Sequence, residues 1–140
     1  MAETPTPPSQ PYPGAGGPMS PSEERTWATA AHWSALVAAF VALAFLGPLV
    51  VLLAKGKDSP WVRRHAVESL NFQLSMLIYG FVGGILAVVL TVLTLGFGLL
   101  LIIPLALAFG ALWLVFTITA AVKAGNGEDY RYPLTIRMVS

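Results

Sequence analysis

An unbroken stretch without Asp, Glu, Lys or Arg runs from Ser69 to Val122 and constrains this chain more than any other feature. As a single helix it would be about 80 Å long, at roughly 1.5 Å per residue. The hydrocarbon core of a bilayer is only about 30 Å thick, so one crossing cannot contain it. The glycines of the segment 95–98 (LGFG) favour a turn there. The stretch therefore predicts two membrane spans, near 70–95 and 99–122.

A second apolar run, 28–54, is long enough for another span, and Trp27 precedes it as an interfacial anchor. Gly47-Pro48 lies inside the run and predicts a kink or a local break. Hydrophobic residues make up 56% of the chain and charged residues 11%, against about 25% charged in a typical soluble domain. We expect an all-α integral membrane bundle with three spans, or four membrane segments if the first run is a broken, re-entrant hairpin.

The two ends of the chain lie outside the predicted spans. Residues 1–25 are rich in proline and glycine and predict a disordered tail, so the membrane domain covers 26–140. Seven of the eight Lys and Arg residues lie in the central loop or in the C-terminal tail 123–140, and the other is Arg25. The positive-inside rule then predicts a multi-pass protein of the cell (inner) membrane. Its central loop and C-terminus would be cytoplasmic and its N-terminal tail outside, unless the first run is re-entrant, which would move the N-terminus to the cytoplasm.

The densest group of polar residues lies where the second span begins. Ser59-Pro60 has the pattern of an N-cap followed by proline at the first helical position. At about 100° per residue, Arg64, Glu68, Asn71 and Ser75 share one helix face, and Arg64 and Glu68 can pair. With three spans, this face and the C-terminal tail lie on the same side of the membrane. The candidate contact residues are Trp61, Arg63, Arg64, His65, Glu68, Asn71, Tyr130, Arg131 and Tyr132.

These candidates fit two interpretations. They close the bundle against each other, or they contact a lipid headgroup or a partner protein. A metal site at His65 and Glu68 lacks an evident third ligand, because His32 is the only other histidine.

Small residues recur at helical spacing in the second span, at Gly80, Gly83, Gly84 and Ala87. Such residues let helix backbones approach closely, and we expect packing within one chain rather than between copies. The few polar residues in the spans predict hydrogen bonds between helices. A weak polar path for a small solute is the other interpretation of Asn71, Ser75 and the threonines.

No sequence motif of an enzyme is present, and we expect no catalysis and no cofactor. The chain has no cysteine, which excludes disulfides and thiolate metal ligands. Eight Lys and Arg residues spread over separate segments form no basic stripe, so nucleic acid is not an expected partner. The expected partners are the lipid bilayer and either a second copy or another membrane protein.

Four elements of the sequence together resemble a known family: His32, Gly47-Pro48, the segment 59–73 (SPWVRRHAVESLNFQ) and the segment 123–133 (KAGNGEDYRYP). They resemble a bacterial group of small membrane proteins described as Tic20-like. That group is similar to the magnetosome-membrane MamF/MmsF proteins and, distantly, to a subunit of the chloroplast inner-envelope protein translocon. The resemblance covers the chain from about Trp27 to the C-terminus.

The resemblance implies a membrane protein without a defined activity. The magnetosome relatives are linked to crystal maturation, but the acidic loop features of that group are absent here. The distant relative in the chloroplast inner-envelope protein translocon implies a protein-conducting path with four spans. The leading hypothesis is a non-enzymatic component that packs with itself or another membrane complex, and the alternative is a channel or translocon-like component.

Overall fold

Four helices make up the computed structural model, which describes residues 19–39 and 43–140. They are α1 (Pro21–Ala39), α2 (Leu46–Lys55), α3 (Pro60–Leu93) and α4 (Leu99–Gly125). No strand occurs in these described ranges. The chain is therefore all-α over its described part, as the sequence predicts.

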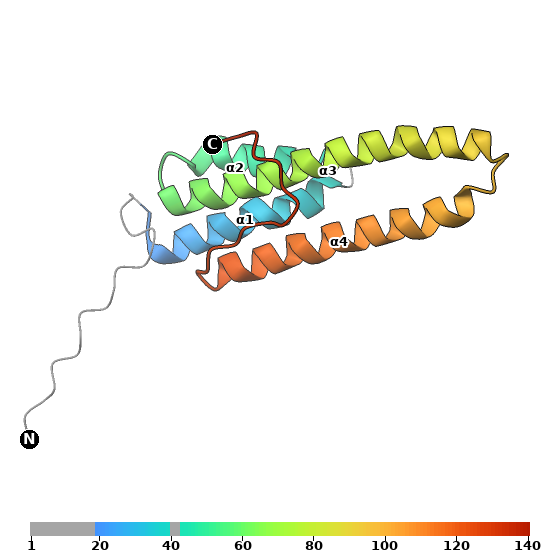
Figure 1. The fold of residues 1–140 in the computed structure, drawn as a ribbon. Coiled ribbons are helices and arrows are strands. Elements are labelled where there is room, and N and C mark those ends of the chain that lie inside the picture. Colours follow the sequence, from blue (N-terminus) through green and yellow to red (C-terminus); the bar gives the residue numbers. More distant parts are fainter. Residues whose placement is uncertain (1–18, 40–42) are drawn as a thin grey trace, which may run out of the picture.

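The two long helices α3 and α4 form an antiparallel hairpin (Figure 1). Ser59 caps α3 by accepting a hydrogen bond from the Val62 N–H at 3.3 Å, with Pro60 in the first turn, as expected. At the far end, Leu95 and Gly96 adopt positive φ angles of 51° and 94°. These left-handed residues reverse the chain at the predicted turn. Both helices are long and apolar enough to cross a membrane.

The prediction of three spans is not confirmed, because the first apolar run is not one helix. It is divided between α1 and α2, which pack against each other as a short hairpin beside the first half of α3 (Figure 1). Gly47-Pro48 lies in the first turn of α2, where proline is tolerated because its missing N–H has no partner in the helix. The sequence predicts a kink or a local break at this pair. The alternative in which the first apolar run is a broken hairpin describes how α1 and α2 lie.

The boundaries of the helices also differ from the predicted boundaries. α1 begins at Pro21, inside the segment 1–25 predicted as a tail, and residues 1–18 of that segment lie outside the described residues. The start of α1, the α2–α3 loop and the C-terminus all lie at the end opposite the α3–α4 turn (Figure 1). This arrangement differs from the predicted one, in which the N-terminal tail lies on the other side from the C-terminus.

Gly47 lets the two short helices approach closely. A Cβ atom built there would lie 2.5 Å from the backbone carbonyl carbon and oxygen of Ser34. We expect Gly47→Ala to lower the free energy of unfolding by about 2 kcal/mol, because the backbones must move apart to accept it. Gly83→Ala is the matched control, since a Cβ there meets no heavy atom within 4 Å and alanine favours helix. Thermal unfolding in detergent measures both; equal effects would contradict close approach at Gly47.

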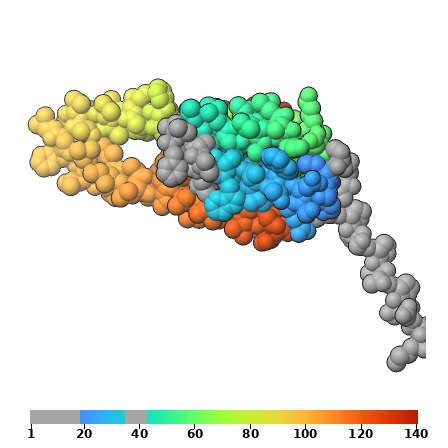
Figure 2. All heavy atoms as spheres, turned by 180° about the vertical axis from the view of Figure 1, so that it is seen from behind, coloured from blue at the N-terminus to red at the C-terminus, as the bar shows by residue number. Residues whose placement is uncertain are grey.

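The molecule divides into a head and two arms. The arms are residues 77–93 of α3 and 99–112 of α4, and their large apolar side chains are exposed. The head comprises α1, α2, the first half of α3, the second half of α4 and the C-terminal residues. Figure 2 shows the arms projecting from the head with an opening between them.

Burial in the head is unusual because many of the buried side chains are polar. Among the described side chains, apolar packing forms small clusters, one around Val51 and Val62, another around Trp61 and a third around Phe72. The buried polar side chains of the head are Glu24, His32, Ser59, His65, Glu68, Ser69, Asn71, Gln73, Ser75 and Thr117. Buried polar groups are stable only when hydrogen-bonded, so their partners define the site described next.

Candidate functional site

A chain of hydrogen-bonded rings lies at the centre of the head, where α1, α3 and the C-terminal residues meet. His32 Nε2 lies 2.9 Å from His65 Nδ1, and His32 Nδ1 lies 2.9 Å from the Tyr132 hydroxyl. All three side chains are buried. A neutral imidazole has one N–H and one lone pair, so His32 donates to one neighbour and accepts from the other. The three rings therefore form one coupled unit.

The surroundings of Tyr132 fix its ring in place. It stacks on Phe72 with ring centroids 4.0 Å apart and an interplanar angle of 13°. Tyr130 contacts it edge-on at 5.1 Å. Burial raises the pKa of Tyr132 well above its usual range, so the phenol stays protonated and can donate a hydrogen bond. Tyr132 thereby ties the C-terminal residues to the helices of the head.

Two further contacts join α1 to the start of α3. The Ser59 hydroxyl donates to Glu24 Oε1 at 2.7 Å while it caps α3. Ser69 donates to the backbone carbonyl of Ala31 at 2.9 Å. Trp61 is fully buried between α1 and α4 beside Ala28 and Ala124. The start of α3 is thus attached to α1 along its length.

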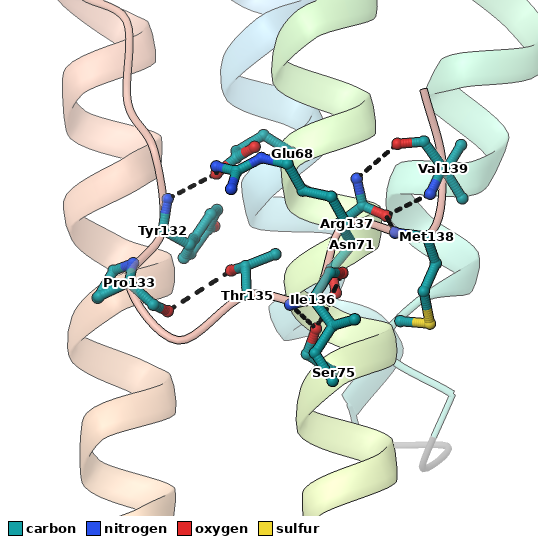
Figure 3. A network of polar contacts seen from close by, with 10 residues as sticks. All are labelled: Glu68, Asn71, Ser75, Tyr132, Pro133, Thr135, Ile136, Arg137, Met138 and Val139. Carbon is teal, nitrogen blue, oxygen red and sulfur yellow. Dashed lines mark hydrogen bonds and ion pairs between the residues drawn. The ribbon is translucent and has the colours of Figure 1, made fainter.

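The last residues of the chain form a segment that we call the C-terminal strap, residues 130–140, and Figure 3 shows how α3 holds it. Glu68 Oε1 accepts the backbone N–H of Tyr132 at 2.8 Å. Asn71 Oδ1 accepts the N–H groups of Met138 and Val139 at 2.9 and 2.7 Å, and its Nδ2 donates to the Val139 carbonyl at 2.8 Å. Side chains of α3 therefore satisfy backbone groups that no secondary structure pairs.

The strap runs along α3 and then turns back. Ser75 Oγ accepts the Ile136 N–H at 2.8 Å, and the Tyr79 hydroxyl donates to the Leu134 carbonyl at 2.9 Å. Leu134 lies at the turn with a φ of 60°. Glu68, Asn71 and Ser75 lie on one face of α3, as the helical spacing predicts. This face of α3 holds the strap through the side chains of Glu68, Asn71 and Ser75.

The predicted ion pair between Arg64 and Glu68 is not formed. Arg64 pairs with Asp129 at 3.5 Å, and Glu68 pairs with Arg137 at 3.3 Å. Asp129 and Arg137 are distant in sequence from Arg64 and Glu68. They pair with these two side chains because the C-terminal segment lies against this face of α3. Arg63 also reaches the C-terminus, where it donates to the backbone oxygen of Ser140 at 2.7 Å.

An open cavity of about 670 Å³ lies between α3 and the strap. Arg64, Arg131 and Arg137 contribute three cations to its lining, and Glu68 and Asp129 contribute two carboxylates. Arg131 is exposed at this surface, and Tyr130 is half-buried. Charged side chains surround this cavity, which lies at the end of the molecule that carries the charged residues.

The small residues of α3 do not pack against another backbone. A Cβ built on Gly80, Gly83 or Gly84 meets no heavy atom within 4 Å, and these residues line a gap between the arms together with Ala87. The predicted close packing within the chain is therefore absent at these glycines, because α3 and α4 diverge here. The arms contact each other less than the helices of the head do (Figure 2).

The polar residues proposed for a solute path have partners. Asn71 and Ser75 bind the strap. The hydroxyls of Thr91, Thr94, Thr117 and Thr119 each donate to the carbonyl four residues earlier in their own helix. Within residues 43–140, these side chains therefore form hydrogen bonds either to the strap or within their own helix.

Sequence reasoning missed several residues of this centre. The sequence marks His32 only as a second histidine and as one element of the family resemblance, although a titratable residue in an otherwise uncharged run is a signal of function. Glu24, Ser69 and Gln73 gave no such signal. Within residues 19–39 and 43–140, no group of three or more His, Asp or Glu side chains is arranged to hold a metal ion.

Comparison with protein-family models gives one match. The model of the magnetosome magnetite crystal formation protein family matches residues 23–139, which is most of the chain. Comparison with curated proteins and with solved structures gives no match. The matched region includes α1 from Glu23 onward, the helices α2, α3 and α4, and all but the last residue of the strap.

Proposed function

Because the chain belongs to the MamF/MmsF family of magnetosome magnetite crystal formation proteins, we propose that it is a non-enzymatic membrane protein that assembles with itself or another membrane protein through its head. The arms anchor it in the bilayer. The head provides the contact surface on one side.

The observation that carries this proposal is a reversal of burial along α3. Up to Ser75 the buried side chains of this helix include many polar ones, whereas from Leu77 onward large apolar side chains are exposed. Apolar side chains are stable when exposed to lipid, and polar ones need partners there. A hydrocarbon core of about 30 Å holds roughly 20 helical residues, which counts back from Leu93 to about Gln73. At about 1.5 Å per residue, the arms span about 25 Å and 21 Å, so the core also takes in one to two further turns of each helix. The rest of the head then lies at and beyond the membrane surface.

The distribution of charged residues favours one side of the membrane for the head. All eight Lys and Arg residues lie in the head and none in the arms or their turn. The positive-inside rule favours a cytoplasmic head. Both termini are then cytoplasmic, which replaces the expectation of an external N-terminal tail.

The surface best suited to a partner is the cavity beside the strap. It brings cationic side chains from α3 and the strap to one exposed place, with Arg131 and Tyr130 accessible at its edge. Arginine and tyrosine are enriched where protein interfaces gain most of their affinity. The alternative of a channel has less support, because Asn71 and Ser75 are occupied by the strap.

The size of the complex in native membranes tests this proposal. After mild detergent extraction, we expect the chain to migrate well above the mass of one copy, and Arg131→Glu to remove most of that species. Lys57→Glu is the matched control, since Lys57 is exposed in the α2–α3 loop away from the cavity. Migration as a single copy, or equal loss with both variants, would contradict assembly through this surface.

A vesicle experiment separates assembly from conduction. Purified protein in sealed vesicles loaded with a small fluorescent dye should leave the dye inside, with or without Asn71→Leu. Dye release that depends on Asn71 would contradict the assembly proposal and favour the channel.

A further inference from the structure

The gap between the arms is an apolar cleft of about 500 Å³. This lies within the range of about 300–1,000 Å³ that is usual for small-molecule sites. Its walls are Tyr79, Gly80, Gly83, Gly84, Leu86, Ala87 and Leu90 on α3 and Ile102, Leu105, Ala106 and Phe109 on α4. Figure 2 shows the opening in the molecular surface at this place.

The cleft continues toward the head. A second cavity of about 310 Å³ shares the lining residue Phe109 with this cleft. Gln73 and Trp113 also line the second cavity. Gln73, Leu77, Gly80 and Gly84 follow one face of α3 at helical spacing. The two cavities therefore adjoin at Phe109 between α3 and α4, and the second has a polar group in its lining.

That polar group is the Gln73 amide. Its Oε1 accepts a hydrogen bond from Trp113 Nε1 at 2.7 Å, which orients the Nε2 group. The side chain is only 3% exposed, and its Nε2 has no hydrogen-bond partner among residues 19–39 and 43–140. Leaving a buried donor unpaired is unfavourable. Gln73 lines the second cavity, and its unpaired Nε2 group points to an acceptor that a bound molecule would supply.

The depth of Gln73 identifies the acceptor. If the arms cross the bilayer, Gln73 lies where the hydrocarbon core ends, roughly 20 residues before Leu93. The ester carbonyls of a phospholipid lie at this same boundary, and its acyl chains extend from there into the core. We propose that the cleft between α3 and α4 binds one acyl chain of a membrane phospholipid, whose ester carbonyl accepts a hydrogen bond from Gln73 Nε2. This inference rests on the membrane placement proposed above.

A lipid chain fits the cleft better than another helix does. Two helices that meet at small residues bring their backbones into contact, and a polar amide at one end would then face a backbone whose own groups are already paired. The described lining of this cleft is mainly apolar, and an unpaired donor, Gln73 Nε2, belongs to the adjoining cavity. One flexible chain with one carbonyl matches both features.

Photolabelling tests the occupant. The probe is a phosphatidylethanolamine with a diazirine in one acyl chain, mixed into vesicles of phosphatidylethanolamine and phosphatidylglycerol that contain the full chain. We expect labels to concentrate on the cleft walls, and Gly84→Leu to reduce them roughly tenfold, the factor that corresponds to about 1.4 kcal/mol. A leucine at this position has open space and need not disturb the fold. Ala108→Leu, on an exposed part of α4 that does not line the cleft, is the control.

Two outcomes would overturn the proposal. Labels spread evenly over the outer faces of the arms, and unchanged by Gly84→Leu, would show that the cleft is not a site. A disulfide between two copies of Ala87→Cys, together with protection of the cleft from the probe, would show that a second copy fills it. If the arms do not enter the bilayer, neither the cleft nor the outer faces are labelled, which separates that failure from the others.

The carbonyl contact has its own test. Retention of diester over diether phosphatidylethanolamine on the purified protein should be several-fold for the native chain and lost in Gln73→Met. Equal retention of the two lipids by the native chain would contradict the role of Gln73.

Discussion

Replacing Asn71 by leucine is expected to lower the free energy of unfolding by about 3 kcal/mol and to release the strap from α3. Asn71 makes three hydrogen bonds to backbone groups of Met138 and Val139, at 2.7 to 2.9 Å. Leucine has similar size but no polar atom. It leaves three backbone groups without their partner in a partly buried place, where each unpaired group costs about 1–3 kcal/mol.

Two measurements check this expectation. The unfolding temperature in detergent should fall by roughly 10 °C, given about 2–8 °C per kcal/mol for domains of this size range. Amide hydrogen exchange at residues 136–140 should become fast, while exchange in the arms stays slow. Thr119→Leu is the control, because the Thr119 hydroxyl bonds only within its own helix. Slow exchange at Val139 in the variant would contradict the hold of Asn71 on the strap.

Replacing His32 by leucine is the second change with a large expected effect, again about 3 kcal/mol. It removes the middle member of the ring chain and leaves the Tyr132 hydroxyl and His65 Nδ1 without their shared partner. Both groups are buried, so water does not replace the lost contacts readily.

A double-mutant cycle with Tyr132→Phe isolates the contact. Phenylalanine keeps the stack on Phe72 and removes only the hydroxyl. The double variant should cost less than the sum of the single variants by about 1–2 kcal/mol, because one unpaired group is removed with the other. Strictly additive effects on the unfolding free energy would show that His32 and Tyr132 are not coupled.

Much of the outer fold was predictable because it follows from local rules. The turn at Gly96, the cap at Ser59 and the polar face of Glu68, Asn71 and Ser75 each depend on neighbouring residues and helical spacing. The lengths of apolar runs give the arms directly. These features need no knowledge of which helices meet.

The centre of the head could not be predicted in this way. His32, His65 and Tyr132 come from three distant segments, and their contact depends on how α1 and the strap pack against α3. The single-span interpretation of the first run failed for a related reason. Its total length fits a bilayer, but the close approach of Gly47 to Ser34 shows that packing against α1 divides the run into two helices.

The central claim is that the chain crosses the membrane twice, with the head and both termini on one side. The native chain has no cysteine, so single cysteines at Ser22, Lys57, Phe97 and Ser140, all exposed, can be labelled without background. Phe97 reports the α3–α4 turn without disturbing the buried Gly98 beside it. With an impermeant thiol reagent on intact cells, the account predicts that only the cysteine at position 97 reacts, and that the other three react after permeabilisation. Labelling at position 22 together with 97, while 57 and 140 stay protected, would mean that the first run crosses the bilayer and would contradict the account.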